Sequence, residues 1–213
     1  MRYGLRSITF LIIVWFLGSC EEPAIKIERL DKGHEAITRD IPQSEQNKST
    51  RDRNYKLMNA LALKTLENGF DGLQIRIWRG YPNKDTGQLF ILTNKNSTWS
   101  AELIRFNYFF FEKGASIGKR SAFRDPASGW NSFTRKLFKL DITTLPDFHS
   151  LPGYDLPTHS DGVEVEYANG NSYRMYTYAV PDMYMHDIPE AGKVVQILEL
   201  IEREFDFKGF VKQ

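Results

Sequence analysis

The chain has 213 residues, of which 41% are hydrophobic and 26% are charged, and its formal net charge is +1 at pH 7. This near-neutral balance gives no bulk electrostatic attraction to nucleic acid or to anionic lipid, so we expect no nucleic-acid partner. The single cysteine excludes a disulfide framework within the chain and a thiolate metal site. The length suits one domain with a sizeable core.

The first 19 residues have the three parts of an export signal. Arg2 and Arg6 supply positive charge, residues 8–17 form an apolar run, and Gly18 and Ser19 are the small residues that a signal peptidase requires. The apolar run is too short for a transmembrane helix, which needs about 20 residues. We therefore expect residues 1–19 to be a signal peptide that is removed from the mature protein.

Leu17-Gly18-Ser19-Cys20 closes this signal and resembles the lipobox of bacterial lipoproteins. In that family a leucine stands three residues before a cysteine that is acylated on sulfur and becomes the new N-terminus after cleavage. Many members have glycine directly before the cysteine, where this chain has serine. The resemblance implies lipid attachment at Cys20, with three acyl chains that hold firmly because each buried methylene contributes about 0.8 kcal/mol. The alternative is a free thiol left after an ordinary secretory signal.

Glu21 follows the cysteine, at the position where an aspartate signals inner-membrane retention in some Gram-negative lipoproteins. The resemblance therefore implies a protein of the bacterial cell envelope whose membrane partner is the outer membrane, facing the periplasm or the cell surface. Residues 20–53 are predicted to be the acylated cysteine and a polar, mobile spacer, because residues 41–54 have almost no apolar side chains to offset the entropy of ordering. A single globular domain is expected over residues 54–213.

The domain is predicted to begin with a helix from about Asn54 to before Gly69, where apolar residues recur at intervals of three and four. From Leu73 the period changes to two, and turn residues then separate a first strand from a second. Further strands are predicted over residues 99–111 and 133–142. This order indicates a meander of antiparallel strands.

The clearest local element is a hairpin between Val163 and Thr177. A two-residue turn, Asn169-Gly170, would mix apolar with charged side chains on both faces. A three-residue loop that adds Asn171 instead pairs Val165 with Met175 and separates the apolar face from the charged one. We therefore predict the three-residue loop.

A helix is predicted to close the chain, with Asp187 as its cap and Pro189 in its first turn. One of its faces carries an apolar stripe made of Val194, Ile197, Leu198, Ile201 and Phe205. Both this helix and the first one can pack on one face of the sheet. The sequence thus predicts an α+β fold in which an N-terminal and a C-terminal helix pack on an antiparallel meander sheet as a two-layer sandwich.

A basic, glycine-rich loop is expected between residues 113 and 124. It is no phosphate-binding loop, since three residues rather than four separate its glycines and arginine rather than serine or threonine follows the lysine. Lys119, Arg120 and Arg124 are candidates for binding an acidic glycan or the carboxylates of a protein partner. The alternative is a solvated loop in which Arg124 pairs with Asp125.

Aromatic residues make up 14% of the chain and supply a second group of candidates. Trp130, Tyr176 and Tyr178 are candidates for an exposed platform that binds a sugar or a protein. The strand predicted over residues 99–111 is apolar on both sides toward its end, which implies cover on both faces. Core packing is the alternative for the aromatic residues, and we favour it.

The histidines lack the spacing of a helical zinc site; they are His34, His149, His159 and His186. His149 and His159 flank one loop, near Asp147 and Asp161. They would suit a metal site or a hydrolase, but His159-Ser160-Asp161 are sequence neighbours, which rarely converge as a catalytic triad. We therefore assign no metal ligand, cofactor or catalytic residue.

Glu164 and Glu166 share one face of a predicted strand. Paired carboxylates suit glycosidase chemistry when they line a cleft. A solvated strand face opposite Arg174 is the simpler interpretation, and we prefer it.

Two short segments, Asp125–Trp130 and Leu145–Asp147, resemble motifs of small uncharacterised lipoproteins of the Bacteroidetes type, a likeness that implies no activity. Two hypotheses for function remain. The first, which we prefer, is a non-enzymatic binding or inhibitory module, such as an immunity lipoprotein, that binds a protein or a glycan. The alternative is a small exported hydrolase or metal-dependent enzyme centred on residues 149–161.

Overall fold

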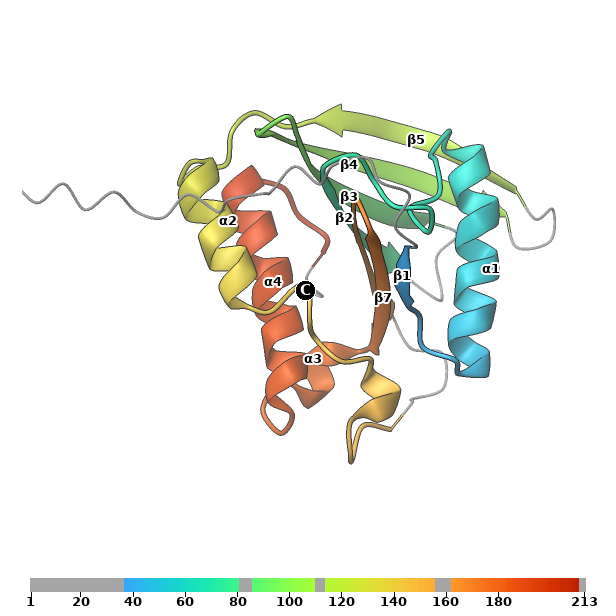
Figure 1. The fold of residues 1–213 in the computed structure, drawn as a ribbon. Helices are drawn as coiled ribbons and strands as arrows, with labels where there is room; N and C mark the ends of the chain where they lie inside the picture. The colour runs from blue at the N-terminus through green and yellow to red at the C-terminus, as the bar shows by residue number, and fades with distance from the viewer. Residues whose placement is uncertain (1–36, 81–85, 110–113, 156–161, 211–213) are drawn as a thin grey trace, which may run out of the picture.

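The computed structural model describes residues 37–80, 86–109, 114–155 and 162–210 (Figure 1). Within these ranges the chain forms a seven-stranded sheet with the order β1-β7-β6-β2-β3-β4-β5. β1 runs parallel to β7, and the other neighbouring strands are antiparallel. The strands are β1 (Thr38–Asp40), β2 (Leu73–Gly80), β3 (Thr86–Lys95), β4 (Thr98–Phe109), β5 (Gly114–Ala122), β6 (Gly162–Asn169) and β7 (Ser172–Ala179).

Helices cover both faces of this sheet. α1 lies on one face, whereas α2 and α4 lie on the other (Figure 1). The helices are α1 (Glu45–Ala60), α2 (Trp130–Lys139), α3 (Pro181–Tyr184) and α4 (Pro189–Phe205), with a short 3₁₀ helix η1 (Phe148–Ser150). The α+β class and the meander from β2 to β5 are confirmed. The two terminal helices enclose the sheet, however, rather than sharing one face of it.

The enclosure follows from the alternation of side chains along each strand. On β2, Ile75 and Ile77 point into the core beneath α4, whereas Trp78 points into a second core beneath α1. α1 contributes Leu57 and Met58 to that second core. Because apolar side chains on both faces of the central strands need cover, the sheet requires a helix on each side.

α1 begins at Glu45, nine residues before the predicted start. The side chain of Ser44 caps it by accepting a 3.1 Å hydrogen bond from the backbone N–H of Asn47. The prediction that residues 41–54 form a mobile spacer was wrong, and the folded domain extends at least to Thr38 in β1. In the first half of α1 the buried Asn47 packs on the sheet, where its Oδ1 accepts a 2.9 Å hydrogen bond from the hydroxyl of Thr177 in β7, so this contact is polar rather than apolar.

α2 occupies most of the segment that was predicted to be a strand over residues 133–142. Its buried residues, Phe133, Thr134 and Leu137, recur at intervals of three and four and thus share one helix face. The expected basic loop is also regular structure, because residues 114–122 form the edge strand β5. The helix was missed because residues 133–142 were judged without the neighbours that bury Phe133 and Leu137, and β5 was missed because its strand structure comes from pairing with β4.

The hairpin of β6 and β7 has neither of the turns considered from the sequence. Val165 lies opposite Tyr176 rather than Met175, and two residues, Gly170 and Asn171, connect the strands. The Oδ1 atom of Asn169 stabilises this turn. It accepts hydrogen bonds from the backbone N–H of Asn171 over 3.1 Å and from the backbone N–H of Ser172 over 2.9 Å, and a third from the Ser172 hydroxyl. The prediction assumed that one face of the hairpin is apolar and the other charged. In the structure both faces are covered, so this pattern does not determine how the two strands are paired.

α4 confirms the predicted C-terminal helix. Pro189 is its first residue, and Ile188 rather than Asp187 occupies the N-cap position. All five residues of the predicted apolar stripe are buried in the core. No helix in the described part of the chain is long and apolar enough to cross a membrane.

Candidate functional site

A layer of polar side chains is buried between α1 and the sheet, which is unusual for a protein interior. Each is at most 9% exposed, and together they come from α1, β2, β6 and β7: Asn47, Asn54, Gln74, Arg76, Glu164, Glu166 and Thr177. Burial of such groups is costly unless each finds a hydrogen-bond partner. Their pairing therefore decides which of them stabilise the fold and which remain open to a ligand.

Glu166 is held by two aromatic side chains. The indole Nε1 of Trp78 donates to its Oε2 over 2.7 Å, and the hydroxyl of Tyr173 donates to its Oε1 over 2.9 Å. Burial raises the pKa of Tyr173, and the charge of Glu166 raises it further, so the phenol stays a donor. Both carboxylate oxygens of Glu166 are thus occupied inside the fold.

Arg76 is buried beside this carboxylate and donates from each of its three guanidinium nitrogens. It donates to Oε1 of Gln74 over 2.9 Å, to the carbonyl of Lys64 over 2.8 Å and to the sulfur of Met58 over 3.2 Å. Burial lowers the pKa of Arg76, whereas the charge of Glu166 opposes this effect. The group links β2 to α1 and to the segment that follows it.

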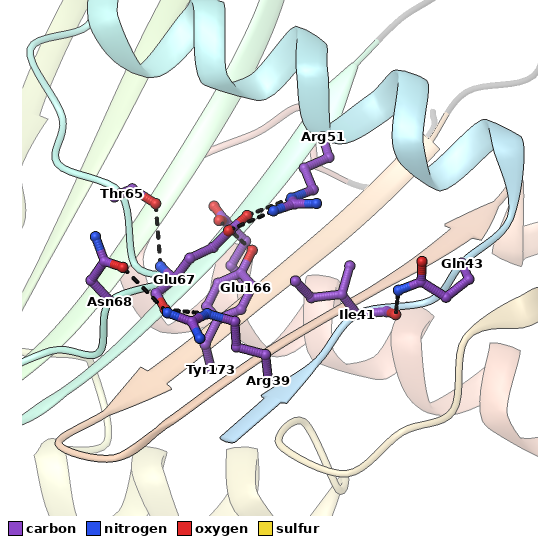
Figure 2. Close-up of polar contacts among 9 residues, drawn as sticks. All are labelled: Arg39, Ile41, Gln43, Arg51, Thr65, Glu67, Asn68, Glu166 and Tyr173. Atoms are coloured by element: carbon purple, nitrogen blue, oxygen red, sulfur yellow. Dashed lines mark hydrogen bonds and ion pairs between the residues drawn. The ribbon is translucent and has the colours of Figure 1, made fainter. Parts of the chain in front are cut away.

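Arg51 on α1 binds Glu67 through two parallel hydrogen bonds, of 2.5 Å from Nε and 2.6 Å from Nη2 (Figure 2). Arg39 of β1 donates to the backbone carbonyl of Glu67 over 2.9 Å. Burial opposes ionisation of Glu67, but hydrogen bonds from Arg51 and Tyr55 lower the pKa of this carboxyl below its ordinary value. This cluster attaches α1 and β1 to the segment between α1 and β2.

Glu164 lies at the end of the polar layer and lines a small cavity. Arg53 and Asn54 donate hydrogen bonds to its two oxygens. Burial raises the pKa of Glu164, and the nearby charge of Arg53 opposes this rise. The cavity has a volume of about 20 Å³ and is also lined by Trp78 and Phe106. The Oδ1 atom of the neighbouring Asn54 is buried and accepts no hydrogen bond from the described residues.

The expectation that Glu164 and Glu166 form a solvated strand face was wrong. They are 6% and 3% exposed, respectively, because α1 covers them. Arg174, which was expected opposite them, instead donates to Asp40 over 2.5 Å and to the carbonyl of Thr143 over 3.1 Å. The two carboxylates do not flank an open cleft as glycosidase chemistry requires, since Glu166 is fully engaged with neighbouring side chains.

The predicted basic residues lie in the edge strand β5 and directly after it. Lys119, Arg120 and Arg124 are all exposed. Arg120 forms a 3.4 Å ion pair with Glu102 and donates to the carbonyl of Leu61 over 3.1 Å. Lys119 and Arg124 form no ion pair with a residue that the structure describes. Lys119 and Arg120 thus belong to the edge strand β5, whereas Arg124 lies in the loop that follows it.

The predicted aromatic residues do not form one platform. Tyr176 and Tyr178 are each 1% exposed and belong to the core, so they cannot present a binding surface. Trp130 is half-buried, stacks on Trp99 with ring centroids 6.3 Å apart, and donates to Asp125 over 2.7 Å. The favoured core alternative is therefore correct for the two tyrosines.

His149 is oriented by Asp147, with 2.7 Å between its Nδ1 and the Oδ1 of Asp147. The other oxygen of Asp147 accepts from the N–H of Thr177 over 2.8 Å and from its hydroxyl over 2.9 Å. His159 and Asp161 lie outside the described residues. Within the described ranges, no group of three or more potential ligands could hold a metal ion.

Sequence reasoning missed the partners that α1 supplies, namely Arg51, Arg53 and Asn54. Their acidic partners are far away in sequence: 16 residues separate Arg51 from Glu67, and 110 separate Asn54 from Glu164. No local spacing signals such pairs. No protein-family model matches the chain, and no curated protein matches it either.

Proposed function

We propose that this protein is a non-enzymatic binding module, of an inhibitory or immunity type, held at the bacterial outer membrane by lipid on Cys20. The lipobox-like segment 17–20 supports the anchor. Hydrogen bonds within the fold occupy the carboxylates of Glu67 and Glu166, which supports a structural role for them rather than a chemical one.

The observation that carries the binding role is the exposed, basic edge of the sheet at β5. Among the described strands it has a neighbour on one side only, and Ile117 within it is 43% exposed. A free strand edge offers N–H and C=O groups to an added strand. The cations Lys119, Arg120 and Arg124 favour an acidic segment by charge complementarity. The proposed partner is therefore a protein that presents an extended acidic segment.

A β-bulge interrupts the regular pairing of the edge strand β5 with β4. The pairing of β4 with β5 shifts between Arg105 and Phe106, which leaves Gly118 as the extra residue on β5. Bulges and lysines on an edge strand discourage pairing between copies of one protein. An acidic partner, in contrast, is attracted by the charge of Lys119. The edge therefore favours an acidic segment over a second copy of this chain.

Photo-crosslinking tests this role. A photoreactive amino acid replaces Ile117 in the full-length protein in its native cell, and the same amino acid at exposed Gln196 on α4 is the matched control. We expect a specific adduct from position 117 and none from position 196. Lys119→Glu with Arg124→Glu should reduce the adduct at least fivefold. An adduct unchanged by charge reversal, or no adduct at position 117, contradicts the proposal.

The pair of Asp147 and His149 favours a second candidate function, a hydrolase or metal-dependent enzyme. A carboxylate that accepts from Nδ1 fixes the tautomer of histidine in catalytic and metal sites and directs Nε2 outward. Titration of the protein with Zn²⁺ and assays with activated esters test this candidate. Loss of binding or turnover in His149→Ala, with the fold intact, would support it, and neither activity in the unaltered protein would reject it.

A further inference from the structure

The extra residue in β5 decides to which face of the sheet the side chains of this edge strand point. Ile117 lies opposite Phe106 of β4, and Lys119 lies opposite Arg105, with Gly118 as the extra residue between them. Phe106 belongs to the core beneath α1, so its neighbour Arg105 points to the other face, on which α2 and α4 lie (Figure 1). Ile117 and Lys119 therefore lie on opposite faces, although residues two apart in a regular strand share one face.

The α1 face of this edge carries an exposed apolar side chain and a cation that already has a partner. Ile117 is the exposed apolar residue. Arg120 lies opposite Ile104, which belongs to the core beneath α1, and it pairs with Glu102 on the same face. A carboxylate brought to this face would compete with Glu102 for Arg120, whereas an apolar side chain would remove Ile117 from water. The α1 face of the edge therefore favours an apolar residue in the partner.

The α4 face of the same edge carries two cations that lack a carboxylate. Arg105 and Lys119 lie directly opposite one another, and like charges at such positions destabilise a sheet. Gln88 of β3, which lies opposite Arg105 on its other side, is neutral. Neither cation forms an ion pair within the described part of the chain. An acidic side chain placed next to Lys119 would offset this repulsion, so the α4 face favours an acid in the partner.

We propose that the segment that docks at β5 is a strand in which acidic and apolar residues alternate. Its acidic residues lie on the α4 face beside Lys119, and its apolar residues lie on the α1 face beside Ile117. This inference rests on the docking proposed above and specifies the sequence pattern of the partner. A segment that is acidic at every position is disfavoured, because half of its carboxylates would face Ile117 and Glu102.

Two synthetic peptides of identical composition and charge test this pattern. One peptide alternates acidic and apolar residues (TEVEVEVT), the other groups them (TEEEVVVT), and both have blocked ends and a fluorescent label. Fluorescence anisotropy measures their binding to the lipidated full-length protein in a nonionic detergent, with protein-free micelles as the blank. We expect the alternating peptide to bind at least tenfold more tightly than the grouped one.

Variants of the two cations test which face receives the acids. Arg105→Glu with Lys119→Glu should reverse the preference, so that this double variant binds TKVKVKVT at least tenfold more tightly than TEVEVEVT. Lys119→Gln alone is a milder change and should weaken binding of TEVEVEVT at least threefold. Lys139→Gln, the same change at an exposed site on α2, is the matched control and should bind as the parent does.

The outcomes separate this pattern from the docking on which it rests. Equal binding of the alternating and grouped peptides, or an unchanged preference in the double variant, overturns the pattern. Binding of neither peptide overturns it as well. In each of these cases a charge-dependent crosslink from position 117 would still support docking at β5, whereas loss of that crosslink would contradict the docking itself.

Discussion

The indole Nε1 of Trp78 donates a 2.7 Å hydrogen bond to Oε2 of Glu166, and both side chains are buried beneath α1. Tyr173 donates to the other oxygen over 2.9 Å. A carboxylate taken out of water needs donors on its oxygens to offset the lost hydration. These two aromatic residues thus make it possible for Glu166 to lie inside the domain.

Trp78→Phe and Tyr173→Phe should each lower the free energy of unfolding by about 1–3 kcal/mol, because each leaves a buried oxygen of Glu166 without its donor. Urea unfolding followed by circular dichroism measures this effect. Tyr184→Phe is the matched control, since that hydroxyl donates to the carbonyl of Asp155 at an exposed site. A loss in Tyr173→Phe no greater than in Tyr184→Phe would show that Glu166 does not depend on its donor.

Glu164→Gln should stabilise the protein increasingly as the pH rises. Burial raises the pKa of Glu164 in the folded state above its ordinary value of 4.5. The unfolded chain therefore releases the proton first, so the free energy of unfolding of the unaltered protein falls as the pH rises through the raised pKa. Glutamine has no proton to lose. Urea titrations between pH 4.5 and 8 should show a widening difference, and a difference that stays constant with pH would contradict the raised pKa.

Glu67→Gln should have the opposite pH dependence. Burial alone would raise the pKa of Glu67. Hydrogen bonds from Arg51 and Tyr55 outweigh this effect and lower the pKa below 4.5 in the folded protein. Its contribution is therefore present above about pH 4.5 and lost as the pH falls through the lowered pKa. The variant should be less stable than the parent at pH 6, and the two should converge toward pH 3. Glu199→Gln, at an exposed site on α4, is the control and should parallel the parent.

Asp147→Ala should destabilise the domain by about 2–3 kcal/mol, because its carboxylate accepts from the N–H and hydroxyl of Thr177 and caps the first turn of η1. His149→Ala should cost less, since that side chain is 33% exposed. Hydrogen exchange at the amide of Thr177 measures the local effect. Unaltered protection of this amide in Asp147→Ala would contradict the role of the carboxylate.

The elements predicted correctly are those in which the spacing of apolar residues along the sequence matches the residues that the fold buries. α4 has an apolar stripe because one of its faces packs on the sheet, and β2 alternates as a strand should. α1 was predicted to start too late because its first half packs through Asn47 and Arg51 on polar groups that come from distant segments. Such pairs have no local signal, so the buried polar layer emerges only once the strands are aligned.

The binding proposals assume that the domain is displayed at a membrane, so the modification of Cys20 is the central claim. Mass spectrometry of the N-terminal peptide of the protein purified from its native host tests it most directly. We predict a mature chain that begins at Cys20 and carries a diacylglyceryl group and an N-acyl chain, and Cys20→Ser should abolish the modification and release the protein from the membrane fraction. Cleavage at another position, or an unmodified thiol at Cys20, would contradict the account.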